Sequence, residues 1–471
     1  MTTEATIQVR YPKMMLSVLM AGTFTGLFGE TALNMALTNL MSQFSLSAGQ
    51  AQWLVTGYLL TLAVFVPVSA FLVRWFNTRV LILTALCVSL AGCLIAALAP
   101  GFAVLLMGRV IQAIGTGVIL PVMMSAALLI FPVYQRGVVM GMIGIAITLA
   151  PALGPTISGF IITLFSWHAI FWLSALAYAA IILLAVKSIA PIGDITRPRI
   201  DIVSLLLSSA GFSGIIYGLA ILAEHSLSDP AVWGSLLAGV LCLGVFARRQ
   251  THMAMPMIHP DVFRNPLFII GLIMMILSMM SVLSAAIILP VFLKDVLMLS
   301  AALAGILLLP GNIINVVFSP LIGFLYNRFD SRPFVVCGSL FMLMSAALFL
   351  YAIGENAPVW QIVAAFMLLC LGVTCVIMPA QTTAMSALPA RLYADGSAVW
   401  NTFYQVAGAV GTASAISLMS FYRDAAAAQQ TATAALASGI HAVFWLSLLL
   451  GLLSLVFAFF MKKPRPHADA A

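Results

Sequence analysis

The stretch PVSAFLVRWFNTR, residues 67–79, decides the fold because it occurs a second time as PLIGFLYNRFDSR, residues 320–332. A proline, a Phe-Leu pair, a further phenylalanine and a closing arginine recur at the same spacing in both copies. Each copy follows a long apolar segment, so the pattern predicts two related halves that run in the same direction. Parallel repeats of this kind are typical of membrane transporters, which hold their substrate between the halves.

The composition predicts an all-α polytopic membrane protein. The chain has 471 residues, of which 63% are hydrophobic and 7% are charged, whereas soluble domains have about 25% charged residues. The net charge of +7 does not indicate nucleic-acid binding, because the basic residues stand singly at segment ends. The six cysteines lie inside apolar segments without metal-ligand spacing, so neither a metal site nor a disulfide framework is expected.

Fourteen apolar segments are long enough to span a membrane. They are 14–37, 52–73, 80–99, 103–129, 137–161, 168–187, 202–222, 231–247, 267–292, 301–325, 333–352, 359–385, 395–421 and 439–461. The two repeat copies follow the second and the tenth segments, whereas two adjoining six-helix halves would place the second copy after the eighth. We therefore predict a six-helix bundle at 1–190, a linker with two extra transmembrane helices at 191–262, and a second six-helix bundle at 263–471.

The distribution of Lys and Arg predicts the orientation. If the N-terminus is inside and the segments alternate, Lys294 and Arg423 are the only basic residues at outside ends, and Arg109 lies within the membrane. All other basic residues then lie at inside ends. We expect a multi-pass protein of the plasma (inner) membrane with both termini in the cytoplasm.

The first apolar segment contains GTFTGLFGETALNMAL, residues 22–37, with an acidic residue, Glu30, deep inside it. Gly22, Gly26, Glu30 and Asn34 recur every four residues and therefore share one helical face. A carboxylate in hydrocarbon costs about 2.5 kcal/mol or more, so such a residue indicates function by default. The alternative is a carboxylate that only neutralises a neighbouring cation.

Motifs along nearly the whole chain resemble the major facilitator superfamily, and more closely its fourteen-helix drug:proton antiporter branch, which includes the lincomycin-type efflux proteins. The matching motifs are Glu30-Thr31-x-x-Asn34-x-Ala36-Leu37, Trp53-Leu54-Val55-Thr56-Gly57-Tyr58-Leu59, Gly108-Arg109-x-x-Gln112-x-x-Gly115-x-Gly117, Gly144 with Pro151-x-x-Gly154-Pro155-x-x-x-Gly159, Trp167-His168-x-Ile170-Phe171, and Gly396-x-x-x-x-Asn401-x-x-x-Gln405-x-x-Gly408-x-x-Gly411. The resemblance implies two six-helix bundles with two extra helices between them. It also implies export driven by a proton gradient, without a cofactor.

The chain departs from the family pattern in the loop after the second segment. The family has an Asp there, but this chain has Arg74 in the first copy and Asn327 in the second. A closed-state contact built on that Asp is therefore not expected, and Arg79 and Arg332 are free to pair elsewhere. Asp201 and Asp395 stand at the starts of apolar segments, where a carboxylate favours the positive end of the helix dipole.

We assign conformational roles to residues at these loops and in the glycine-rich segment 137–161. Pro151 and Pro155 permit a bend there, so the segment is interpreted either as a hinge or seal between the halves or as tight packing alone. The predicted conformational residues are Arg74, Arg79, Gly154, Pro155, Arg328 and Arg332.

Glu30 and Arg109 are predicted to form the proton-coupling site. They lie about 10 Å and about 9 Å from the outer ends of their segments at 1.5 Å per residue, so they reach a similar depth. Burial favours the neutral form of a carboxyl group, and a nearby guanidinium favours the charged form. A change of their separation between inward and outward states would bind and release a proton in turn. The alternative for Arg109 is a structural cation that binds backbone carbonyls.

The predicted substrate cavity combines uncharged polar groups with apolar walls, which suits small lipophilic molecules. The polar groups could equally serve as contacts between helices. The second half shows Asn and Gln where some relatives have acids, so no second proton site is expected there. The predicted substrate-binding residues are Asn34, Trp53, Tyr58, Gln112, Thr116, Asn312, Asn315, Gln381, Asn401 and Gln405.

The leading hypothesis is a proton-coupled antiporter that exports lipophilic drugs or toxic organic compounds. A transporter of the same fold for a physiological amphipathic metabolite or lipid is the first alternative. An intramembrane enzyme is less favoured, because the loops are short and contain no cluster of carboxylates or histidines, and no P-loop for ATP-driven pumping occurs. We therefore expect no enzymatic activity, a monomer, and the lipid bilayer and a small lipophilic substrate as partners.

Overall fold

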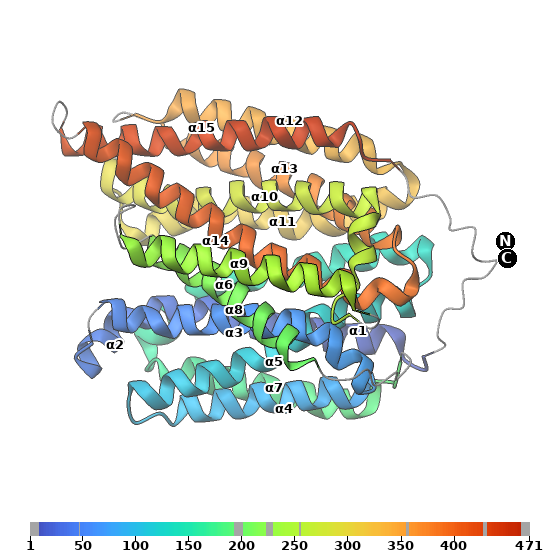
Figure 1. The fold of residues 1–471 in the computed structure, drawn as a ribbon. Coiled ribbons are helices and arrows are strands. Elements are labelled where there is room, and N and C mark those ends of the chain that lie inside the picture. Colours follow the sequence, from blue (N-terminus) through green and yellow to red (C-terminus); the bar gives the residue numbers. More distant parts are fainter. Residues whose placement is uncertain are drawn as a thin grey trace.

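The computed structural model describes residues 9–46, 48–192, 201–222, 229–253, 256–354, 358–426 and 431–462, which form helices joined by short connections (Figure 1). The side chains of Pro155 and Asn327 lie outside this description, although both residues are in helices. The long helices are α1 (Pro12–Ala32), α3 (Ala48–Trp75), α4 (Thr78–Ala97), α5 (Phe102–Ile130), α6 (Val133–Leu164), α7 (His168–Ser188), α8 (Ile202–Leu222), α9 (Pro230–His252), α10 (Pro266–Val291), α11 (Ala301–Arg328), α12 (Ser331–Ala352), α13 (Val359–Ser386), α14 (Tyr393–Ala426) and α15 (Ala432–Ala458).

Shorter elements connect or extend these helices. They are η1 (Leu33–Ala36), α2 (Leu37–Phe44), η2 (Pro260–Arg264), η3 (Phe292–Val296) and η4 (Ala390–Leu392). Apolar helices suit a membrane because every helix satisfies its own backbone hydrogen bonds. Polar side chains begin several of them, as where the side chain of Asn77 accepts a hydrogen bond from the backbone N–H of Val80 at the start of α4.

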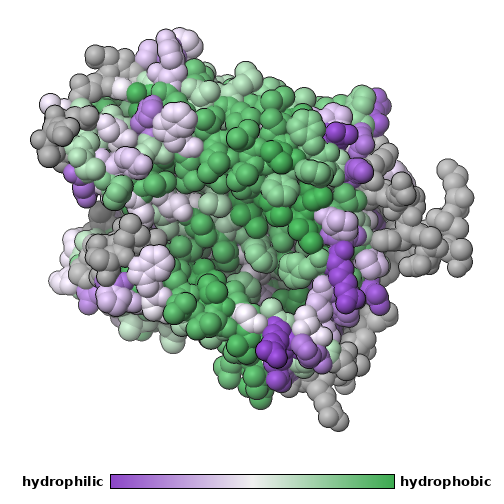
Figure 2. Space-filling view, turned by 45° about the horizontal axis from the view of Figure 1, so that its top comes forward, coloured by the Kyte–Doolittle hydropathy of each residue, from purple (hydrophilic) through white to green (hydrophobic). Residues whose placement is uncertain are grey.

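Each predicted apolar segment corresponds to one long helix. The segments 80–99, 267–292 and 439–461 run up to three residues past the ends of α4, α10 and α15, and the segment 14–37 continues past Ala32, the end of α1, through η1 to the first residue of α2. Twelve helical spans in the described part of the chain are long and apolar enough to cross a membrane. The helices α6, with 32 residues, and α14, with 34, are not among these twelve, so the predicted number of fourteen spans stays a prediction. Figure 2 shows a broad apolar belt between hydrophilic ends, as expected of a multi-pass membrane protein.

The helices form two groups with an inserted pair between them, which confirms the predicted fold class. In Figure 1 the first group, α1 and α3–α7, lies below and the second, α10–α15, lies above. The inserted helices α8 and α9 pack against each other and cross in front of the boundary (green in Figure 1). The start of α1 and the end of α15 lie at the same end of the bundle (Figure 1). The domain boundaries stay predictions, and residues 193–200, 223–228 and 254–255 of the proposed linker lie outside the described chain.

The two groups meet along two seams, α6 against α11 and α3 against α14. Glycines bring the backbones of α6 and α11 into close contact. A Cβ atom on Gly141 would lie 2.9 Å from the carbonyl oxygen of Ser319, and one on Gly323 would clash with the carbonyl oxygen of Gly137. The glycine-rich part of α6 therefore packs directly on the second copy of the repeat.

Candidate functional site

A cavity of about 490 Å³ lies between the two groups of helices. Its walls come from α1, α3, α5 and α6 of the first group, from α10 and α14 of the second, and from α8 of the inserted pair. Most of the lining is aliphatic. The polar side chains on the wall are Glu30, Thr31, Asn34, Thr56, Asn401, Tyr404, Gln405 and Thr412.

Glu30 is the one charged residue among the described residues that line this cavity. One of its carboxylate oxygens is buried without a hydrogen-bond partner. Within the described chain, no basic side chain lies within ion-pair distance of the carboxylate. Three residues after Glu30, α1 gives way to the 3-10 turn η1, which carries Asn34 into the same lining. A change of helix type in mid-span often accompanies a hinge.

Arg109 is fully buried and binds the backbone of α1 rather than the carboxylate of Glu30. Its Nη1 donates to the carbonyl oxygen of Gly29 at 2.7 Å, and its Nη2 donates to the main-chain carbonyl oxygen of Glu30 at 3.4 Å. Its Nε donates to the carbonyl oxygen of Leu54 in α3 at 3.3 Å. The guanidinium lies 4.2 Å from the ring centroid of Tyr58. Arg109 therefore ties α5 to the turn of α1 that carries Glu30.

Three of the predicted substrate-binding residues surround Arg109 instead of lining the cavity. The hydroxyl of Tyr58 donates to the carbonyl oxygen of Gly26 at 2.9 Å and shares a 2.9 Å hydrogen bond with the hydroxyl of Thr116. The side-chain oxygen of Gln112 accepts from Arg109 at 3.1 Å. Tyr58, Gln112 and Thr116 are all fully buried. This cluster joins α1, α3 and α5 and holds the first half together.

The remaining predicted substrate-binding residues divide into two sets. Asn34, Asn401 and Gln405 line the cavity with Glu30. The side chain of Asn401 donates to the carbonyl oxygen of Ser397 at 2.8 Å. The structure does not bring the others to the lining. Asn315 accepts a hydrogen bond from Thr374, Gln381 donates to the sulfur of Met124 at 3.5 Å, Trp53 lies 5.8 Å from the ring of Tyr217, and Asn312 lies in α11.

A buried ion pair joins the two halves at the end of the bundle where α1 begins and α15 ends. Nη2 of Arg74, near the end of α3, lies 2.6 Å from a carboxylate oxygen of Asp395, near the start of α14. The other carboxylate oxygen lies at 2.7 Å, and Nη1 of Arg74 donates to the carbonyl oxygen of Pro256 at 3.0 Å. The Asp395 side chain is 1% exposed. We call this group the inter-half ion pair.

The other predicted conformational residues that the structure describes have contacts within their own half of the protein. Nη2 of Arg79 donates to the carbonyl oxygen of Val186 at the end of α7, at 2.8 Å. Arg328 lies over the ring of Phe324 and Arg332 over that of Phe459. Gly154 allows α6 to approach α1, because a Cβ atom there would clash with the side chain of Thr31. The side chain of Pro155 is outside the described part of the chain.

A second, more exposed ion pair connects the inserted helices. Nε and Nη2 of Arg249 lie 2.8 Å and 3.0 Å from the two carboxylate oxygens of Asp201. Ser204 donates a further hydrogen bond to the same carboxylate. The hydrogen bonds from Arg249 lower the pKa of Asp201 to about 2. Asp201 precedes α8 and its candidate membrane span, which begins at Ile202, and the pair fixes the start of α8 to the end of α9.

Sequence reasoning missed two features of this site. It assigned no role in the cavity to the inserted pair, yet Ile216 and Leu219 of α8 line the wall. It interpreted Asp395 through the helix dipole alone, although Asp395 pairs with Arg74 in the other half. A charged residue at a helix start is a weak signal for an ion pair across the chain, and α8 is too uniformly apolar to show which face is covered.

The fold and the cavity define a class, a multi-pass membrane protein with two related helical halves around a central site, which is the architecture of secondary transporters. The sequence model of the Major Facilitator Superfamily matches residues 19–412, and the chain belongs to this superfamily. It is therefore a transporter and not an enzyme.

Relatives and solved structures agree with this assignment. The chain is 41% identical to lincomycin resistance protein LmrB of Listeria innocua over 464 residues, 97% of this chain and 98% of the relative. It is 39% identical to LmrB of Bacillus subtilis, with 98% of both chains covered. The proton:xylose symporter XylE bound to 6-bromo-6-deoxy-D-glucose has the same fold, with a TM-score of 0.67, 15% identity and 97% of both chains covered. The human organic anion transporter MFSD10 matches with a TM-score of 0.64 and 13% identity, over 95% of this chain and 99% of its own.

Proposed function

We propose that this chain is a proton-coupled antiporter that exports lipophilic drugs or toxic organic compounds by alternating access. The observation that carries the proposal is the position of Glu30, the one charged side chain among the described residues on the wall of the cavity between the two halves. The two LmrB relatives, named as lincomycin resistance proteins, support a drug as the substrate.

Antiport requires that the proton and the substrate do not leave by the same route at the same time. Both sites are in one cavity here, because Glu30 lines the space that a substrate would fill. A protonated Glu30 is neutral and is tolerated in an apolar, closed cavity, whereas the carboxylate needs water or a charged partner. A substrate that enters next to Glu30 changes the access of the Glu30 carboxyl group to water. This competition couples the release of the proton to the loading of the substrate.

Arg109 contributes by positioning the α1 turn that carries Glu30. Its guanidinium holds the carbonyl oxygens of Gly29 and Glu30, so α1 and α5 move as a unit. Rocking of the halves then changes the surroundings of the Glu30 carboxylate mainly through the second half, where Tyr404 and Gln405 lie on the same wall. The proton gradient takes the place of a cofactor, and one chain is sufficient for the cycle.

The orientation of the protein is part of the proposal. Arg74 is in the last turn of α3, Arg136 is in the first turn of α6, Arg264 precedes α10 and Arg328 ends α11, and these helix ends lie at the end of the bundle where α1 begins. An excess of basic residues marks the cytoplasmic side, so both termini are in the cytoplasm of a bacterial cell and the protein is in the plasma membrane. The inter-half ion pair then closes the cavity on its cytoplasmic side.

Transport by purified protein in proteoliposomes tests the proposed function. Lincomycin and the lipophilic dye ethidium serve as probes, with an imposed pH gradient as the only energy source. We expect uphill accumulation of at least one probe, and we expect a protonophore to abolish it. Equal accumulation with and without the gradient would refute proton coupling. If only an amphipathic lipid added to the same panel is moved, the alternative of a metabolite transporter replaces the drug exporter.

A further inference from the structure

Helix α8 occupies the seam between the halves on one side of the protein. It packs against α3 of the first half and α14 of the second (green in Figure 1). Phe212 and Ile216 of α8 are buried against Ala63 of α3, and Val406 of α14 packs against the same cluster. An inserted helix that served only as a spacer would have no need to reach both halves at once.

The same face of α8 reaches the cavity. Ile216 and Leu219 are three residues apart and therefore project from one side of the helix, and both line the cavity wall. Ile216 is 3% exposed. The other lining residues come from the two halves, so α8 completes the wall at the α3–α14 seam with two aliphatic side chains.

Close packing between α8 and α9 supports the position of this wall. A Cβ atom on Gly239 of α9 would lie 2.8 Å from the backbone nitrogen of Ile215 and 2.9 Å from the carbonyl oxygen of Gly211. The glycines therefore let the two helices meet at backbone distance. A wall on a rigid, closely packed helix discriminates between ligands better than one on a loop.

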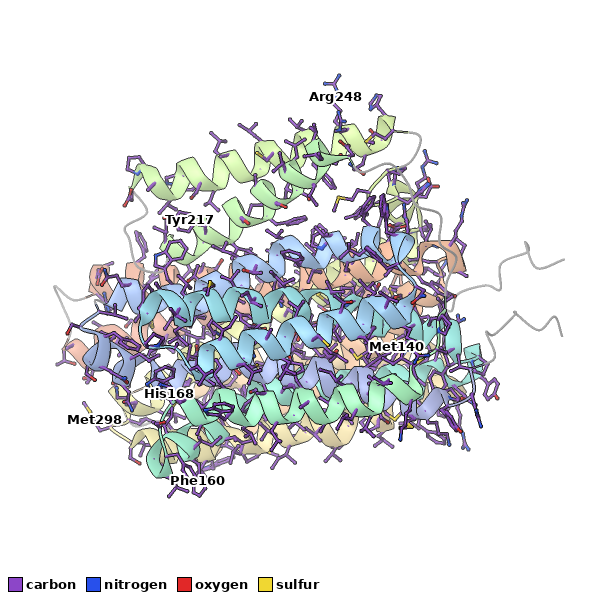
Figure 3. The ribbon with its side chains drawn as sticks, turned by 90° about the horizontal axis from the view of Figure 1, so that it is seen from below. Met140, Phe160, His168, Tyr217, Arg248 and Met298 are labelled. Atoms are coloured by element: carbon purple, nitrogen blue, oxygen red, sulfur yellow. The ribbon has the colours of Figure 1, made fainter. Side chains whose placement is uncertain are left out.

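Both ends of α8 are also held. Tyr217, labelled in Figure 3 at the end of α8 away from Arg248, has its ring 5.8 Å from that of Trp53 in α3. At the opposite end, the side chain of Gln250 in α9 donates to the hydroxyl of Ser204 at 2.7 Å. One end of α8 is thus attached to α3 of the first half, and the other end is attached to α9.

We propose that α8 is a specificity-determining wall of the substrate cavity, in which Ile216 and Leu219 set the size and shape of the molecule that is accepted. The proposal rests on the proposed function, because it takes this cavity as the transport site. Aliphatic side chains offer no charge or hydrogen bond, so they select by fit. A change of one methylene group in such a pocket alters discrimination by about 10-fold or more.

Ligand binding by the purified full-length chain in lipid nanodiscs tests the proposal. The probes are ethidium and the larger dye rhodamine, with Kd values measured for both without a pH gradient. The variants are Leu219→Trp, which narrows the cavity, and Leu219→Ala, which widens it. The matched control is Leu237→Trp on α9. Leu237 is 63% exposed and follows Leu236, which contacts Gly218 of α8, so it lies at the same depth but faces lipid.

We expect Leu219→Trp to weaken rhodamine binding relative to ethidium by about 10-fold, and Leu219→Ala to shift this ratio the other way. Ile216→Val, a smaller change, moves the ratio in the direction of Leu219→Ala. Leu237→Trp leaves the ratio at the wild-type value. If both Leu219 variants keep the wild-type ratio, or if Leu237→Trp changes it equally, α8 is not a specificity wall.

Results that refute the proposed function differ from results that refute the proposed role of α8. If the wild-type chain shows no pH-driven transport but the Leu219 variants still change the ratio of Kd values, proton-coupled export is wrong and the wall stands. If the wild-type chain binds neither dye, the cavity is not a site for lipophilic molecules and both proposals are overturned.

Discussion

Nη2 of Arg74 donates a hydrogen bond to the carboxylate of Asp395 at 2.6 Å, across the boundary between the two halves of the transporter. The two residues are 321 positions apart in the chain. The family pattern places an acid in the loop after the second span, whereas this chain places the arginine there and the acid in the other half. Arg74 of the inter-half ion pair also donates to the carbonyl oxygen of Pro256, which follows the inserted pair.

The inter-half ion pair is predicted to stabilise the state in which the inner ends of the halves are closed. Arg74→Gln leaves the 1% exposed Asp395 carboxylate without its partner, and removal of one member of a buried pair costs about 3–5 kcal/mol. We expect a shift of the population toward the state with separated inner ends. Spin labels at the exposed, repeat-related positions Phe76 and Phe329 report this separation as a distance distribution.

Two further variants complete that experiment. Arg249→Gln breaks an ion pair within the inserted helices and should leave the label distances unchanged. The double variant Arg74→Asp with Asp395→Arg should restore part of the closed population. An unaltered distance distribution in Arg74→Gln would show that this ion pair does not hold the halves together.

Arg109 is predicted to be irreplaceable by lysine. Its guanidinium donates to the carbonyl oxygens of Gly29, Glu30 and Leu54 in fixed directions, and a single ammonium group cannot reproduce this fork. A hydrogen bond to a charged group contributes about 1.5–3 kcal/mol, and the lysine variant loses some of these bonds. We expect Arg109→Lys to lower the thermal unfolding midpoint in detergent and to abolish transport. Arg423→Lys, at a residue whose side chain is 44% exposed, is the control, and equal midpoints for both variants would count against this role.

The α6–α11 seam is predicted to depend on Gly323. A methyl group there meets the carbonyl oxygen of Gly137 in the opposite helix, so Gly323→Ala must push the helices apart. Gly305→Ala in the same α11 helix is a matched control, because a Cβ atom at Gly305 meets nothing within 4 Å. We expect reduced transport with normal expression for Gly323→Ala and wild-type behaviour for Gly305→Ala. Wild-type transport by both would show that the seam tolerates separation.

The Asp201–Arg249 pair determines the pH range in which protonation of Asp201 affects the stability of the inserted helices. Arg249 lowers the pKa of Asp201 to about 2, below about 3.9 for an unfolded Asp. The stabilisation from the Asp201–Arg249 pair is therefore fully present above the pKa of Asp201 in the unfolded chain, and it is lost as the pH falls through about 2. Asp201→Asn should thus leave the shape of the transport profile unchanged between about pH 5 and pH 8. A profile shifted in that range by Asp201→Asn would contradict this assignment.

The repeat and the cost of burial explain what could be predicted from the sequence. Pro67 and Pro320 stand at equivalent points of two halves, and this relation survives in the sequence because each half keeps the same helix ends. The sequence predicts a functional role for Glu30, because a carboxylate in hydrocarbon is too costly to retain without one. Glu30 does line the cavity, although its role in proton coupling stays a prediction.

The other features of the candidate site could not be predicted, because they depend on which helices pack against each other. The sequence places Gln112 and Thr116 on the face of Arg109, but only the packing of α1 and α3 decides that this face is covered and does not line the cavity. Asp395 finds its partner in the other half, and no local pattern contains that information. Helix α8 is apolar on all sides, so its sequence cannot show that Leu219 faces the cavity.

In the proposed cycle the Glu30 carboxylate couples proton movement to transport. The most direct measurement compares wild type and Glu30→Gln in proteoliposomes, in two assays with the same dye. Glu30→Gln keeps the size and a hydrogen-bonding group but does not titrate. We predict that it loses uphill accumulation driven by a pH gradient and keeps exchange of internal for external dye without a gradient. Undiminished uphill accumulation in Glu30→Gln would contradict the account.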